Sequence, residues 1–390
     1  MKLDVKTTLP ADADRAVLAG RIWRPDIGGP SVVAIRAGRA IDVTATWRTV
    51  SDLCDAPDPA KALARTEGED MGPLAPILAN TPPETRDGAK PWLLAPVDLQ
   101  AIKAAGVTFA VSMIERVIEE KARGNPAAAD TIRKEIVALV GDDLGKLVPG
   151  SPQAMRLKEV LIAQGAWSQY LEVGIGPDAE IFTKSQPMSA VGTGMDAGLH
   201  PKSTWNNPEP EIALIVASSG AIVGATLGND VNLRDVEGRS ALLLGKAKDN
   251  NASCALGPFV RLFDEGFGLD DVRAAVIDLE VTGLDQFVLR GSSSMAKISR
   301  DPADIARQMI GPHHQYPDGA ALFLGTMFAP TQDRDGPGQG FTHKIGDVAR
   351  VSTPKLGALV NTMRHSNDCE PWNFGTRALM AHLARRFPGG

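Results

Sequence analysis

Residues 206–217 read NNPEPEIALIVA, and in this stretch two glutamates precede an apolar run that is rich in β-branched side chains. Such a run predicts a strand, and side chains two residues apart on a strand point to the same face. Glu209 and Glu211 are therefore expected on one face, about 6.6 Å apart at Cα for a rise of roughly 3.3 Å per residue. That separation suits two carboxylates that share one cation.

A second apolar run, residues 221–228, follows a Ser-Ser-Gly turn signal and leads to an Asn-Asp pair. If the two runs form a hairpin in which Ala217 faces Ala221, Asp230 lies beside Glu209 and the proline before it. Three carboxylates then meet, and a bound cation would keep them ionised. Oxygen ligands favour Mg²⁺, with Mn²⁺ or Ca²⁺ as alternatives. An isolated Glu-x-Glu is usually a solvated strand face, so the third acid is what favours a metal site.

The composition excludes several classes of function. The 41 basic and 47 acidic residues give a net charge of −6, which argues against a general nucleic-acid-binding or membrane-surface role. The first residues lack the apolar core of a signal peptide and no apolar run is long enough to cross a bilayer, so we expect a cytoplasmic protein. The three cysteines are widely spaced, which indicates reduced structural thiols, and the six histidines show no HExxH spacing for zinc.

The length of 390 residues allows two domains, or one large domain with a smaller attachment. We predict a small β-rich N-terminal subdomain and linker over residues 1–90, then a larger domain over 91–390 that contains a helical segment at about 107–165. Short strands are expected at 18–23, 31–36 and 40–45, a linker at 67–91, and helices at 107–123, 127–140, 156–164, 256–263, 302–309 and 377–386. Glycine-rich residues 192–198 depart from GxGxxG and are interpreted as a flexible loop near the site rather than a cofactor loop.

Seven motifs in the C-terminal half form an ordered set. They are NPEPE at 207–211, GNDVNLRD at 228–235, AKDNNASC at 247–254, PDG at 317–319, LGT at 324–326, a terminal Gly-Asp in 341–347, and VSTPKLGALVN at 351–361. Together they resemble the fumarylacetoacetate hydrolase superfamily. The resemblance implies an α+β fold, a mixed β-roll with peripheral helices, assembled as a homodimer or homotetramer.

The resemblance also implies roles for individual residues. The two glutamates and the aspartate of the family motif bind a divalent cation, and these positions match Glu209, Glu211 and Asp230. A lysine about twenty residues later reaches the substrate, and that position matches Lys248. An ammonium beside carboxylates keeps its charge and can stabilise an enolate, although a lysine paired with an acid is also a common surface feature.

One departure from the family pattern bears on the reaction. Hydrolases of this family carry a stretch like GLNYADHAAE, whose His and Glu activate water, whereas residues 106–115 here read GVTFAVSMIE. Glu115 persists, but Ser112 replaces the histidine. Serine is not a general base near neutral pH without an activating group. The chain therefore resembles more closely the branch that dehydrates 2-keto-3-deoxy sugar acids.

The resemblance thus implies a Mg²⁺-dependent dehydratase that converts a small-molecule 2-keto acid, such as 2-keto-3-deoxy-D-xylonate or L-arabinonate, to 2,5-dioxopentanoate. The cation would polarise the keto group, with Glu115 transferring a proton, Lys248 as electrostatic partner or alternative base, and Ser112 as a positioning hydroxyl. Candidate substrate-binding residues are Lys184, Arg234, Thr326 and Thr353. The alternatives are a C–C bond hydrolase of an acylpyruvate or diketo acid and a non-catalytic metal-binding scaffold.

Overall fold

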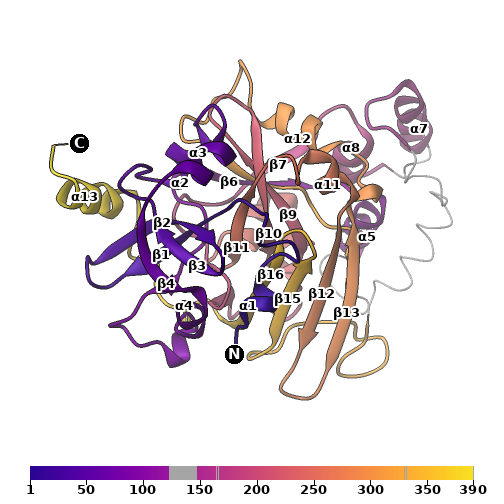
Figure 1. Cartoon of the computed structure of the whole chain (residues 1–390). Coiled ribbons are helices and arrows are strands. Elements are labelled where there is room, and N and C mark those ends of the chain that lie inside the picture. The colour runs from indigo at the N-terminus through magenta and orange to yellow at the C-terminus, as the bar shows by residue number, and fades with distance from the viewer. Residues whose placement is uncertain (123–146, 164, 166, 329, 331, 390) are drawn as a thin grey trace.

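Two sheets with helices around them form the body of the molecule (Figure 1). The computed structural model describes residues 1–122, 147–163, 165, 167–328, 330 and 332–389. In this part of the chain the larger sheet has eleven strands in the order β4-β3-β2-β1-β11-β10-β9-β14-β6-β7, with β5 paired to β1. The smaller sheet has five, in the order β13-β12-β15-β16-β8. This arrangement is α+β, as predicted.

The strands of the larger sheet are β1 (Leu18–Arg24), β2 (Gly29–Arg36), β3 (Arg39–Asp42), β4 (Glu69–Pro73), β5 (Trp92–Leu93), β6 (Ala101–Gly106), β7 (Glu180–Ser185), β9 (Pro210–Val216), β10 (Ile222–Asp230), β11 (Cys254–Leu262) and β14 (Ala320–Phe323). Those of the smaller sheet are β8 (Asp196–Leu199), β12 (Val276–Thr282), β13 (Val288–Ser294), β15 (Val348–Thr353) and β16 (Gly357–His365). The helices are α1 (Val5–Thr8), α2 (Val50–Cys54), α3 (Pro59–Arg65), α4 (Leu74–Ala79), α5 (Ala110–Ala122), α7 (Pro152–Ala163), α8 (Gln169–Ile175), α9 (Arg234–Glu237), α10 (Leu244–Lys248), α11 (Leu269–Ala274), α12 (Pro302–Met309) and α13 (Thr376–Arg386).

Strand β9 is the centre of the core because both of its faces are buried. Ile212 and Leu214 pack into a cluster that includes residues of the smaller sheet, such as Val351. Ala213 and Ile215 point the other way, into a cluster with the N-terminal strands. Burial of each large side chain contributes about 1.5–3 kcal/mol. The β9 backbone is therefore held from both sides, which fixes the glutamates at its start.

The N-terminal strands continue the same sheet as β9, since β1 pairs with β11. The expected linker at 67–91 is partly wrong. The chain there forms β4, which pairs with β3, and α4, whose Leu74 and Leu78 are buried. The prolines and glycines suggested a linker, but Pro73 is the N-cap residue of α4, and Gly72 has φ 95° within β4, where the pairing with β3 is irregular. A domain boundary near residue 90 stays a prediction.

Other expected elements can be compared directly. The helices expected at 107–123, 156–164, 302–309 and 377–386 correspond to α5, α7, α12 and α13. The helix expected at 256–263 is wrong, because these residues belong to the fully buried strand β11. The helix expected at 127–140 lies outside the described residues. Residues 192–198 pack closely instead of forming a loose loop, and a Cβ on Gly198 would lie 2.0 Å from the Asn251 carbonyl oxygen.

Where the chain is described, none of its helices combines the length and the apolar character that spanning a bilayer requires.

Candidate active site

The hairpin of β9 and β10 carries the acidic residues, and its register depends on one irregularity. The pairing shifts by one residue between Ile222 and Gly224, which marks a β-bulge. Beyond the bulge, the backbone N–H of Asp230 donates to the carbonyl of Glu209 at 3.0 Å. Directly opposed residues point to one face, and a one-residue slip exchanges the faces. The bulge therefore turns Asp230 toward Glu209 and Glu211.

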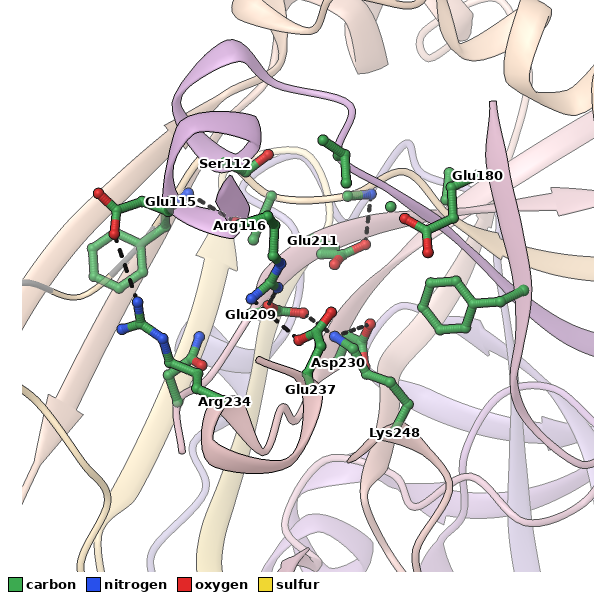
Figure 2. A pocket seen from close by; sticks show the side chains of 18 residues that line it. Ser112, Glu115, Arg116, Glu180, Glu209, Glu211, Asp230, Arg234, Glu237 and Lys248 are labelled. Atoms are coloured by element: carbon green, nitrogen blue, oxygen red, sulfur yellow. Dashed lines mark hydrogen bonds and ion pairs between the residues drawn. The ribbon is translucent and has the colours of Figure 1, made fainter. Parts of the chain in front are cut away.

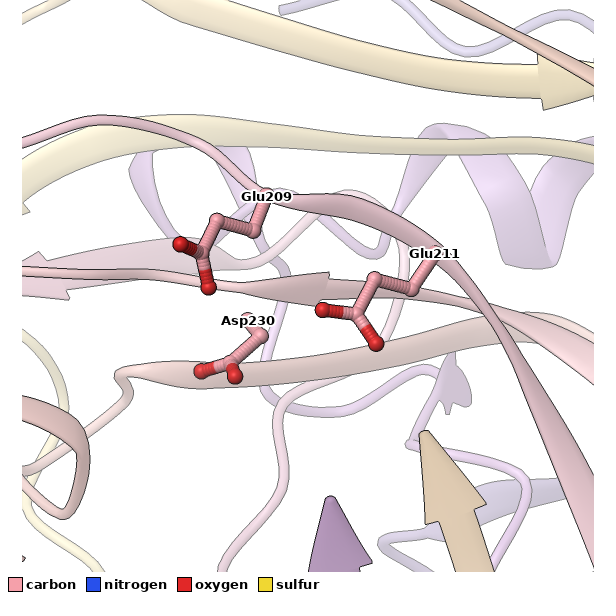
Figure 3. Close-up of side chains that lie close together, drawn as sticks. All are labelled: Glu209, Glu211 and Asp230. Carbon is pink, nitrogen blue, oxygen red and sulfur yellow. The ribbon is translucent and has the colours of Figure 1, made fainter. Parts of the chain in front are cut away.

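The three acids converge as the sequence predicted (Figure 3). Glu209, Glu211 and Asp230 each offer a carboxylate oxygen, and these atoms all lie within 4.8 Å of one another. The residues are only 4, 2 and 2 % exposed, respectively. Buried carboxylates this close repel one another unless positive charge lies between them. Three oxygen donors in this arrangement fit a hard divalent cation such as Mg²⁺.

Two lysines meet the acids from the side. Lys248, the last residue of α10, donates to Asp230 Oδ2 at 3.0 Å and also contacts Glu209 Oε2. Lys184 on β7 lies 2.8 Å from Asp230 Oδ1. Burial alone would raise the pKa of Asp230, but the charges of Lys184 and Lys248 hold it below its ordinary value. Asp230 is therefore ionised at neutral pH.

Glu211 has a different environment. It accepts a hydrogen bond from the backbone N–H of Gly325 at 2.7 Å. Burial, together with the negative charges of Asp230 and Glu209, raises the pKa of Glu211 well above its ordinary value. This carboxyl group therefore lacks sufficient positive charge from the chain itself. A divalent cation among the three acids would supply it.

A cavity opens over the acids (Figure 2). Among the described residues, its lining includes the carboxylates of Glu115, Glu180, Glu209, Glu211, Asp230 and Glu237, and the basic side chains of Arg116, Arg234 and Lys248. Even when the Lys184 ammonium on Asp230 is counted, six acids against four bases leave an excess of negative charge, and a cation would offset it. The donor set and the charge both fit the Mg²⁺ that the sequence implied.

Helix α5 covers one side of the cavity and carries the predicted residues Ser112 and Glu115. The Ser112 hydroxyl donates to the Phe109 carbonyl at 2.9 Å, within its own helix. Glu115 lies 3.6 Å from Arg234, whose guanidinium lies over the Trp205 ring at 4.2 Å. Figure 2 shows this pair on the side of the cavity away from Glu180. Both predicted catalytic residues of α5 thus line the cavity, with Glu115 turned toward Arg234.

The predicted substrate-binding residues divide into two groups. Arg234 and Thr326 line the cavity. Lys184 does not: it is fully buried, and its ammonium is engaged by Asp230 and by backbone carbonyls. Its ammonium holds Asp230, and a contact of Lys184 with substrate stays a prediction. Thr353 ends β15 in the smaller sheet and is outside the cavity lining, so its predicted contact with substrate is not supported.

Sequence reasoning missed three charged residues of the cavity, Arg116, Glu180 and Glu237. Arg116 contacts Glu209 and lies 3.2 Å from Glu237. Glu180 begins β7, and burial together with the charge of Glu237 raises its pKa to about 7. No local pattern identifies these residues, because their partners are far away in the sequence. The one available signal was the position of Arg116 next to Glu115 on the covering helix.

The architecture defines the class of fold. No family model matches the chain. A fumarylacetoacetate hydrolase from Exiguobacterium antarcticum superposes with a TM-score of 0.53 at 17% identity, covering 90% of this chain and 100% of the other. The chain therefore has the α+β fold of fumarylacetoacetate-hydrolase-like proteins, as the motifs predicted.

Structures of dehydratases superpose on the chain with higher TM-scores than this hydrolase does. The structure of "2-keto-3-deoxy-D-arabinonate dehydratase complexed with magnesium and 2,5-dioxopentanoate" superposes with a TM-score of 0.60 at 20% identity, covering 89% of this chain and 99% of the other. In sequence, the chain is 29% identical over 185 residues to 2-dehydro-3-deoxy-D-arabinonate dehydratase of Saccharolobus solfataricus. It is 27% identical over 194 residues to a probable 2-keto-3-deoxyxylonate dehydratase of Haloferax volcanii.

These sequence matches are partial. They cover 47% of this chain and 58% of the Saccharolobus protein, and 50% of this chain and 63% of the Haloferax protein. The chain thus spans less than two thirds of each curated relative that it matches. The predicted resemblance to the dehydratase branch is confirmed at this level.

Proposed function

We propose that the protein is a Mg²⁺-dependent dehydratase of a 2-keto-3-deoxy sugar acid. The expected substrate is a pentonate such as 2-keto-3-deoxy-D-xylonate or L-arabinonate, and the expected product is 2,5-dioxopentanoate. The observation that carries the proposal is the buried group of Glu209, Glu211 and Asp230 at the base of one cavity. The names of the similar dehydratases support the choice of substrate class.

Bound Mg²⁺ would supply Lewis acidity to a 2-keto acid and so make its C3 protons more acidic. Glu209, Glu211 and Asp230 would hold the ion through carboxylate oxygens. The Lys248 ammonium, between Glu209 and Asp230, adds positive charge where negative charge develops on the substrate. Lys248 keeps its proton in this setting, because the two carboxylates raise its pKa against the effect of burial. We therefore assign it an electrostatic role rather than that of a base.

Proton transfer needs a group whose pKa lies near the working pH. Glu180 meets this condition, with a pKa of about 7, and it faces the cavity. We propose that Glu180 removes a C3 proton and that the C4 hydroxyl leaves as water after protonation. The unsaturated acid then isomerises to the aldehyde. Glu115 stays the second candidate for one of these proton transfers, since it lines the opposite wall beside Arg234.

Ser112 favours dehydration over hydrolysis. The resemblance implies that a hydrolase of an acylpyruvate on this fold uses a histidine at the position of Ser112 to activate water, whereas the Ser112 hydroxyl donates to the carbonyl of Phe109, the residue before α5. Elimination requires an acid and a base but no attacking water. Ser112 is proposed to position a substrate hydroxyl.

The test is a panel of 2-keto-3-deoxy acids assayed with Mg²⁺ and with chelator. We expect turnover with Mg²⁺ only, release of 2,5-dioxopentanoate from a pentonate, and no solvent ¹⁸O in a carboxylate product. Incorporation of ¹⁸O into an acyl carboxylate would indicate a hydrolase. Absence of turnover despite cation binding would favour a non-catalytic scaffold. Comparing Glu180→Gln with Glu115→Gln would show which carboxylate transfers the proton, and sedimentation would test the predicted homodimer or homotetramer.

A further inference from the structure

Arg116 lies between two carboxylates of the cavity (Figure 2). One nitrogen of its guanidinium, Nη2, contacts Glu209 Oε1, and the other, Nη1, lies 3.2 Å from Glu237 Oε2. Glu209 belongs to the acidic group on the hairpin, whereas Glu237 ends helix α9. Arg116 itself comes from α5. Three separate elements therefore meet at this guanidinium.

Glu209 is shared by two positive groups. Its Oε1 contacts Arg116 and its Oε2 contacts Lys248. Lys248 is also bound to Asp230, so it joins two members of the acidic group. A divalent cation bound to Glu209 would compete with Arg116 for the negative charge of this carboxylate. The positive charge of the cation would also repel the guanidinium at short range. Glu237 offers Arg116 a second acceptor that is independent of the cation.

The three basic residues of the cavity lining differ in their accessibility. The Arg116 side chain is 13 % exposed, against 3 % for Lys248 and 5 % for Arg234. Lys248 is enclosed by the acids and Arg234 is placed against Trp205. Arg116 is therefore the most exposed of the three basic side chains that line the cavity. A planar guanidinium also matches a carboxylate by two parallel hydrogen bonds, which an ammonium cannot do.

We infer that Arg116 determines specificity by binding the carboxylate of the 2-keto acid beside the cation, and that Glu237 is the positioning residue that orients it. The identity of the acid rests on the proposed function, but the competition between Arg116 and the cation for Glu209 does not. Arg116 then has two opposite effects. It weakens the binding of the cation alone, and it strengthens the binding of a carboxylate once the cation is present.

The experiment measures both effects by titration calorimetry on the full chain, without turnover. Mg²⁺ is titrated alone, and oxalate, an unreactive anion with two carboxylates, is titrated at saturating Mg²⁺. For Arg116→Gln we expect Mg²⁺ to bind at least about threefold more tightly and oxalate at least about tenfold more weakly. Arg116→Lys keeps the positive charge but cannot donate two parallel hydrogen bonds to one carboxylate. Its affinity for oxalate should lie between those of the wild-type protein and Arg116→Gln. Glu237→Gln should weaken oxalate binding less than Arg116→Gln does.

Arg290→Gln is the matched control, since Arg290 is 74 % exposed and pairs with Glu280 on the smaller sheet. It should change neither titration, and circular dichroism should show that every variant is folded. Unchanged oxalate affinity in Arg116→Gln, or weaker Mg²⁺ binding, would overturn the inference. If the panel of sugar acids shows no turnover while both titrations shift as expected, the proposed reaction fails and the role of Arg116 stands.

Discussion

Two charge clusters at the larger sheet, each around a buried carboxylate, differ in how their charges are balanced. In the N-terminal cluster, Arg24 pairs with Asp42 at 2.8 Å and also contacts Glu69, while Arg386 reaches Asp42 at 2.8 Å. Burial alone would raise the pKa of Asp42, but hydrogen bonds from Ser31, Thr44 and Arg386 hold it at about 2. This cluster is closed, because its carboxylates already have partners within the chain.

The cluster on the β9–β10 hairpin is not balanced in this way. The pKa of Glu211 is raised well above its ordinary value, and that of Glu180 is raised to about 7. Buried acids with raised pKa values destabilise the fold when ionised, and such groups are concentrated at functional sites. Burial of charge alone does not indicate function. An excess of buried negative charge that the rest of the chain does not compensate is what indicates a functional site.

Glu180→Gln should give the largest effect on function. If Glu180 is the base, its ionised form is active, so the rate of the wild-type protein should rise as pH increases through about 7. The variant should lose that dependence and about 10²–10⁴ in rate, the usual contribution of a general base. A pH–rate profile measures both. A variant with the wild-type profile would remove Glu180 from the mechanism.

Asp42→Ala should break the balanced cluster. The change leaves the buried guanidinium of Arg24 without one of its partners, and loss of one member of a buried ion pair costs about 3–5 kcal/mol. Denaturant unfolding should show this loss, and calorimetry should show unchanged Mg²⁺ affinity in the folded variant. A marginal change in the free energy of unfolding would contradict the distinction between the two clusters.

Glu211→Gln should weaken Mg²⁺ binding without lowering stability, which is the reverse of the effect expected for Asp42→Ala. Removal of one cation ligand should weaken Mg²⁺ binding by more than about 100-fold, beyond the 10–100-fold typical of outer-shell changes. In the absence of Mg²⁺ the melting temperature should stay the same or rise, because a buried excess of negative charge is removed. A variant that melts lower and still binds Mg²⁺ normally would show that Glu211 has only a structural role.

Mg²⁺ itself should stabilise the wild-type fold, since it binds the folded state. At one hundred times the dissociation constant the gain is about 2.7 kcal/mol. Thermal melts with Mg²⁺ and with chelator would detect it. The shift should persist in Asp42→Ala and vanish in Glu211→Gln, and an equal shift in both variants would place the cation elsewhere.

The acidic group could be predicted from the sequence because it depends on local rules. The period of two along β9 and the turn after it bring Glu209, Glu211 and Asp230 together. No residue pattern indicates the bulge between Ile222 and Gly224, however, and it is the bulge that places Asp230 directly opposite Glu209. A register shift of this kind changes which residues are opposed, and the period of two along one strand does not reveal it.

Other features depended on contacts that the sequence does not display. Residues 256–263 read LGPFVRLF, a largely apolar stretch that contains one arginine. Its apolar residues are compatible with a buried helix or a buried strand, and the pairing of β11 with β1 and β10 makes residues 256–262 a strand. Arg116 reaches Glu209 across 93 residues of sequence. Glu180 acquires its raised pKa from burial and from Glu237. Such residues become visible only when the fold brings distant segments together.

The central claim is that Glu209, Glu211 and Asp230 hold one divalent cation. The most direct measurement is the anomalous diffraction of a crystal grown with Mn²⁺ in place of Mg²⁺. We predict one strong peak within coordination distance of all three carboxylates, and its loss in Glu211→Gln. A saturated crystal with no peak there, or with its only peak at another site, would contradict the account.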